Sequence, residues 1–153
     1  MRAVTGVIVA FFASIGVSSM TMTPDCLADS RYADGIMERK SYHFIVRYHE
    51  EVERSFLHRV IDLSEDCYRW ITQDFNFFRD DPWVWDNRAV IYVYEDRKAY
   101  LSATGMPEWS WAAAQPARKE VHAFDAPLDM FRFALVHELT HLIFREYIGM
   151  SSD

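Results

Sequence analysis

The sequence predicts an α+β domain in which a small mixed sheet with an edge hairpin packs on two main helices. Half of the 153 residues are hydrophobic and 16% are aromatic, which is enough apolar material to bury a core. Short runs of strand formers alternate with two long stretches in which apolar residues recur every three or four positions. The chain contains no repeat and no long linker, so these elements belong to one domain.

The first half of this domain contains two predicted strands around a long helix. Residues 42–48 (YHFIVRY) are rich in strand formers. Residues 50–73 then switch to helical spacing. An aromatic segment, 74–87, is predicted to supply core and rim side chains, because aromatic rings bury large areas. Residues 88–94 (RAVIYVY) consist almost entirely of strand formers and make the strongest predicted strand.

The second half carries a short helix, a hairpin and the last helix. Residues 96–103 are predicted to form the short helix. Residues 110–115 and 120–124 are predicted to pair as two short strands. From residue 128 to residue 147 there is no glycine or proline, and apolar residues recur at helical spacing, which predicts a long helix.

The first forty residues are predicted to precede the folded domain. Arg2 is followed by an uncharged, apolar run over residues 3–17, which is the layout of a secretory signal peptide over residues 1–19. The alternative is an uncleaved membrane anchor through residues 3–23. Both readings place the domain in an exported location, periplasmic or extracellular, with residues 20–40 as a lead-in segment.

Charge and cysteine content narrow the class of partner. Sixteen Lys and Arg against 23 Asp and Glu give a formal charge of −7 without a basic run, so nucleic acid is not an expected partner. A membrane is expected only if the N-terminal segment is retained.

Cys26 and Cys67 lack the spacing of a redox or zinc pair, and Cys67 is predicted to be a buried thiol. The oligomeric state stays open.

The last predicted helix contains the pentapeptide HELTH, residues 137–141. Residues i and i+4 project from the same helix face, so His137 and His141 can bind one metal ion, and zinc readily accepts imidazole nitrogen. The carboxylate of Glu138 can reach a water at that ion and act as general base. The alternative is a core helix whose histidines are satisfied by neighbouring polar groups.

The segment FALVHELTHLIFREYIG resembles the active-site helix of the zincin metallopeptidases, especially the gluzincin-type, peptidase MA-like domains. The preceding order of elements also resembles their N-terminal subdomain, over roughly residues 41–149. The resemblance implies one zinc ion held by His137 and His141, with Glu138 as the catalytic residue and a peptide or protein as substrate. It also implies that residues 41–153 are such a subdomain, truncated after the active-site helix.

The sequence departs from the gluzincin pattern at the third zinc ligand. In gluzincins it is a glutamate on a second helix, whereas Glu146 lies on the same helix and points away from the histidine face. The expected function is therefore zinc-dependent peptide-bond hydrolysis, by a site whose third metal ligand is absent from this chain.

Alternatives to the enzyme remain. One is a non-catalytic exported binding or interaction module with the same fold, and another is an interaction fragment that needs a separate chain. Ala112, Ala113 and Ala114, in the stretch WSWAAAQ, are candidate substrate-binding residues, because a peptide can add to an edge strand as a further strand. An ordinary hairpin strand is the competing interpretation.

Overall fold

The computed structural model describes residues 30–31, 35–77 and 82–148. Six strands form one sheet in the order β1-β2-β3-β4-β6-β5. The strands are β1 (Ser30–Arg31), β2 (Met37–Lys40), β3 (Phe44–Tyr48), β4 (Ala89–Tyr94), β5 (Ala112–Gln115) and β6 (Glu120–Phe124). The helices are α1 (Arg54–Asp74), α2 (Arg97–Thr104) and α3 (Leu128–Ile148), with short 3₁₀ turns η2 (Trp85–Asn87) and η3 (Pro116–Arg118).

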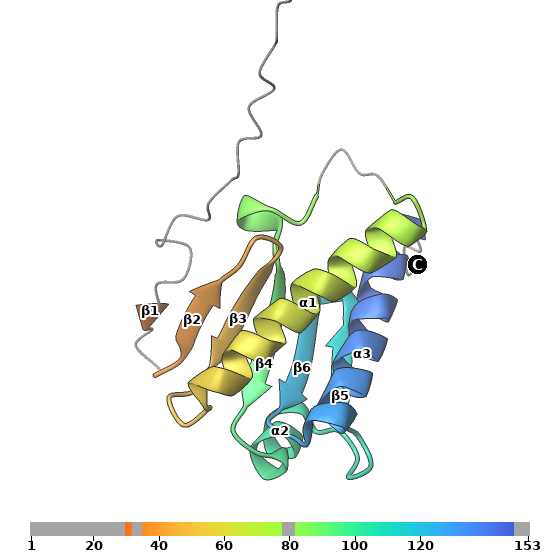
Figure 1. The fold of residues 1–153 in the computed structure, drawn as a ribbon. Coiled ribbons are helices and arrows are strands. Elements are labelled where there is room, and N and C mark those ends of the chain that lie inside the picture. The colour runs from red at the N-terminus through yellow and green to blue at the C-terminus, as the bar shows by residue number, and fades with distance from the viewer. Residues whose placement is uncertain (1–29, 32–34, 78–81, 149–153) are drawn as a thin grey trace, which may run out of the picture.

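The sheet is mixed, as predicted. Strands β3, β4 and β6 run parallel in its centre, and β2 pairs antiparallel with β3. At the opposite edge β5 runs antiparallel to β6, with η3 in the connection between them, which confirms the expected edge hairpin. The α+β class and the two main helices are likewise confirmed (Figure 1).

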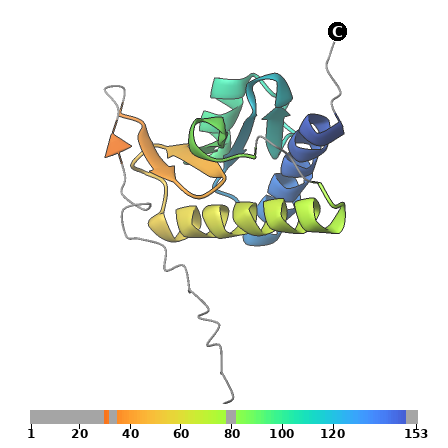
Figure 2. The ribbon, with the colours of Figure 1, turned by 90° about the horizontal axis from the view of Figure 1, so that it is seen from above.

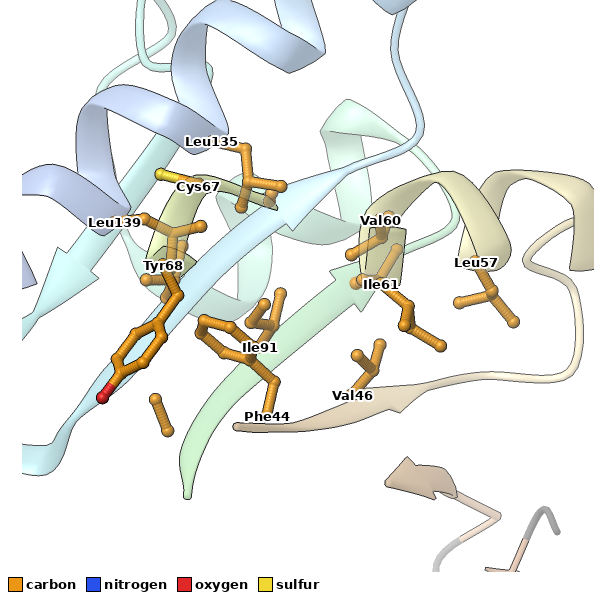
Figure 3. Packing of buried hydrophobic residues seen from close by; sticks show 14 of the residues in the cluster. Phe44, Val46, Leu57, Val60, Ile61, Cys67, Tyr68, Ile91, Leu135 and Leu139 are labelled. Atoms are coloured by element: carbon orange, nitrogen blue, oxygen red, sulfur yellow. The ribbon is translucent and has the colours of Figure 1, made fainter. Parts of the chain in front are cut away.

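Helices α1 and α3 cover one face of this sheet, and they pack against each other as well (Figures 1 and 2). The core between them and the strands follows from alternation along β3 and β4, where every second side chain is buried. Figure 3 shows strand side chains meeting the apolar faces of both helices. Among these residues are Phe44, Val46, Leu57, Val60, Cys67, Tyr68, Ile91, Leu135 and Leu139. The prediction that Cys67 is a buried thiol is confirmed, and burial raises the pKa of this thiol to about 11.

The other face of the sheet carries a polar row that crosses four strands. Glu38 on β2 accepts a hydrogen bond from Arg47 on β3 at 3.0 Å, and Arg47 donates to the Tyr92 hydroxyl on β4 at 2.9 Å. The Tyr92 ring stacks on that of His122 on β6, with the ring centroids 4.8 Å apart. Helix α2 packs beside this row against β4 and β6, where Tyr100 contacts Phe124.

Residues 37–40 differ from the sequence prediction. They lie within the expected lead-in over residues 20–40, but they form β2 and pair in register with β3. The two buried residues of the sequence MERK, Glu38 and Arg39, are charged, and Glu38 forms ion pairs with Arg47 and Lys40. A strand whose buried positions are charged gives no period-two signal.

No helix in the part of the chain that the structure describes is long and apolar enough to cross a membrane. The predicted signal peptide or anchor, within residues 1–23, lies outside the described residues, as does Cys26.

Candidate functional site

Helix α3 presents two faces with different roles. Its buried face packs into the core, through Phe131, Leu135, Leu139, Leu142 and Ile143. The face that the core leaves uncovered carries both histidines of the HELTH segment, which are exposed. Phe133 lies one turn before His137 on that same face and is 72% exposed, with its ring stacked toward the imidazole at 6.2 Å between centroids. The buried face of α3 therefore anchors the helix in the core, and its other face leaves the two imidazoles accessible to solvent.

The two histidine side chains converge. Nε2 of His137 lies 3.0 Å from Nε2 of His141. Two nitrogens that bind one tetrahedral zinc at about 2.0–2.1 Å stand about 3.3 Å apart, so the observed pair fits a metal with a small adjustment. The residues that the spacing predicted as ligands are thus brought together.

Glu138 lies against the edge of the sheet. Its Oε2 accepts a hydrogen bond from the backbone N–H of Ala114 on β5 at 3.0 Å. Because that N–H points away from β6, the outward-facing positions of β5 are Ala112 and Ala114, while the backbone groups of Ala113 face β6. The predicted base and two of the three predicted substrate-binding residues therefore belong to one locus.

A buried hydroxyl chain fixes the start of β5. Ser110 Oγ lies 3.0 Å from the carbonyl oxygen of Ala112, to which it donates. The hydroxyl of Tyr100, on α2, lies 2.6 Å from the same Ser110 oxygen and can only be the donor there. Burial raises the pKa of Tyr100, which keeps this hydroxyl protonated. The two side chains hold β5 at a fixed distance from α2.

A cavity of about 250 Å³ opens between β5 and the first half of α3. Its walls are mostly apolar, and Glu138 and His137 form one end. The lining residues are Trp109, Ser110, Trp111, Ala112, Met130, Phe133, Ala134, His137 and Glu138. Trp109 at its rim is 78% exposed. The cavity is large enough for one bulky apolar side chain directly beside the carboxylate.

No cluster of three or more His, Cys, Asp or Glu side chains that could hold a metal occurs among residues 30–31, 35–77 and 82–148. Glu146 is engaged elsewhere, since it accepts from the indole N–H of Trp83 at 2.6 Å and pairs with Lys119 at 2.9 Å. The described donor set is therefore the two imidazoles.

Sequence reasoning missed Met130, Phe133, Ser110 and Tyr100. A signal existed for the first two, because Phe133 and Met130 precede His137 by four and seven residues and thus share its helix face. None existed for Tyr100 and Ser110, which meet only through the docking of α2 beside β5.

No family model matches the chain, and no curated protein shows significant similarity to it. The function must therefore be inferred from the geometry of the chain itself.

Proposed function

We propose that this protein hydrolyses peptide bonds with one zinc ion held by His137 and His141. The observation that carries the proposal is the convergence of the two Nε2 atoms at 3.0 Å on a helix whose next side chain, Glu138, touches an edge strand. The succession of strand, helix, strand, short helix, hairpin and helix supports it, since it resembles the N-terminal subdomain of gluzincin-type metallopeptidases.

The residues of this chain have separate roles in the proposed reaction. When bound, zinc supplies Lewis acidity toward the scissile carbonyl and the attacking water. Glu138 takes the proton of that water on a carboxylate oxygen and later delivers it to the leaving amine. Ala112 and Ala114 orient the substrate through their outward-facing backbone groups.

The apolar cavity sets the substrate's position and its environment. A bulky apolar side chain seated between Trp111 and Phe133 places the neighbouring peptide bond next to Glu138. It also displaces water from that end of the site, which strengthens the electrostatic contacts there. His137 and His141 would hold the zinc ion and would leave it open to a water and to a further ligand.

A second candidate function is binding without chemistry. The high exposure of Trp109 and Phe133 favours it, because large exposed apolar side chains beside an open edge strand can hold an extended peptide with no metal at all. Glu138 would then serve only as an acceptor for the edge strand.

One experiment separates the two functions. Metal content is measured after zinc loading and dialysis for the wild type, His141→Ala, Glu138→Gln and, as a matched control, His58→Ala, an exposed histidine of α1. We expect only His141→Ala to lose the metal. Cleavage of an unstructured, apolar peptide should fall about 10²- to 10⁴-fold in Glu138→Gln, because a positioned general base is lost.

Equal metal content in His141→Ala and the wild type would refute the metal site. Tight zinc binding by a wild type that cleaves no member of a broad peptide library would instead favour the binding module.

A further inference from the structure

Two of the outward-facing backbone groups of β5 are already paired within the chain. The N–H of Ala114 is bound by Glu138 at 3.0 Å, and the carbonyl oxygen of Ala112 by Ser110 at 3.0 Å. A peptide that adds to an edge strand forms hydrogen bonds with the outward-facing N–H and C=O groups. The edge on which the substrate is proposed to dock is therefore partly occupied by the protein's own side chains.

Ser110 and Glu138 differ in whether they prevent a peptide from pairing with β5. A carbonyl oxygen has two lone pairs, so Ala112 can accept from Ser110 and from a peptide together. A backbone N–H has one proton, so Ala114 cannot donate fully to both Glu138 and a peptide carbonyl. Only the contact of Glu138 excludes a peptide.

We propose that Glu138 competes with the substrate for the amide of Ala114, and that an extended peptide pairing there releases the carboxylate toward His137 and His141. The inference rests on the proposed function and adds its regulation: the base is held on the edge strand at rest and is freed only by a peptide long enough to reach Ala114.

When a peptide competes for the amide of Ala114, the Glu138 side chain moves more easily than the backbone of β5 or α3. The strand is held by the chain from Tyr100 through Ser110 to Ala112, and the backbone of α3 is held by the buried Leu135 and Leu139. The Glu138 side chain, by contrast, is only partly buried and rotates about three bonds. Because a carboxylate is a stronger acceptor than a peptide carbonyl, the contact forms at rest and opposes weak ligands.

The test measures peptide affinity in metal-free protein, so that no cleavage interferes. The probe is a labelled, uncharged, unstructured peptide of about ten residues with one central leucine, titrated in chelator against the wild type, Glu138→Ala and Glu138→Gln. We expect Glu138→Ala to bind roughly tenfold more tightly or better, since a hydrogen bond to a charged group no longer has to be broken. Glu138→Gln has lost the same charge but keeps an acceptor of similar reach, so its affinity should lie between those of the wild type and Glu138→Ala.

A second measurement observes the contact itself. Amide hydrogen exchange at Ala114 should accelerate in Glu138→Ala, while exchange at Ala113, whose N–H faces β6, should stay unchanged. In Ala114→Pro, which lacks the N–H, adding Glu138→Ala should no longer tighten peptide binding.

The outcomes separate the inference from the proposed function. Measurable peptide binding with equal affinity in the wild type and both Glu138 variants overturns the inference and leaves the proposed function standing. Unchanged exchange at Ala114 in Glu138→Ala also overturns the inference. Absence of peptide binding in every variant overturns the edge-docking step of the proposed function, and the inference with it.

Discussion

At the scale of single residues, His122 is a buried titratable group on the face of the sheet that α1 and α3 do not cover. Its Nδ1 lies 3.0 Å from the Tyr94 hydroxyl, and its Nε2 is buried with no hydrogen-bond partner in the described part of the chain. Burial lowers the pKa of His122 more than the nearby Glu120 raises it. The imidazole is therefore neutral in the folded protein near neutral pH.

The folded state should lose stability in mildly acidic solution because of His122. The unfolded chain binds a proton at this residue near pH 6.5, whereas the folded chain resists protonation until lower pH, so the free energy of unfolding falls as the pH drops below about 6.5. Urea unfolding at pH 7.5 and pH 5.0 measures this effect. In His122→Phe, which keeps a ring against Tyr92, the loss between the two pH values should be smaller; an equal loss would assign it to other groups.

The sequence predicted the candidate site only as far as local geometry reaches. The spacing of His137 and His141 is a property of one helix, so their convergence could be predicted without knowing the fold. The contact between Glu138 and Ala114 joins residues 24 positions apart and depends on the docking of α3 beside β5. No local pattern encodes that docking.

At the scale of elements, predictability followed the content of strand-forming residues. Strand β4 was predicted to within one residue, because it consists almost entirely of β-branched and aromatic residues. Strand β2 was missed, because three of its four residues are charged and Glu38 is buried with ion-pair partners that include Arg47 on β3. Helix α1 begins four residues later than predicted, at Arg54.

The two faces of α3 should respond differently to truncation. Leu135 is fully buried, so Leu135→Ala should cost about 2–5 kcal/mol of unfolding free energy. Phe133→Ala, two residues earlier on the exposed face, should change stability by no more than about 0.5 kcal/mol while weakening binding of an apolar peptide. Chemical unfolding and peptide titration of both variants check this, and a large stability loss in Phe133→Ala would show that its ring belongs to the core.

At the scale of the whole molecule, Trp83 ties the segment before β4 to α3. Its ring is fully buried against Phe44 and Tyr68, and its indole N–H donates to Glu146, which also pairs with Lys119 after η3. Three parts of the chain that are distant in sequence meet at this carboxylate.

Trp83→Phe should therefore destabilise the fold, by about 1.5–3 kcal/mol for the lost bond to a charged acceptor. Trp85→Phe provides the matched control: that side chain is 78% exposed and its replacement should change stability by about 0.5 kcal/mol at most. Thermal unfolding followed by circular dichroism compares the two, and equal melting temperatures would remove the assigned role of Trp83.

The position of α3 at the end of the described chain determines the order in which the parts of the site form during folding. This helix follows every strand of the sheet in sequence, and its Phe131 packs on Phe56, so it docks only on strands and a helix made earlier. A helical segment forms on a timescale of about a microsecond, whereas parallel strands with distant partners pair much more slowly. The two imidazoles can thus come together while the chain is still folding, and Glu138 reaches Ala114 only afterwards. A metal captured by the nascent helix would contribute its binding free energy to the formation of α3, before the helix docks on β5.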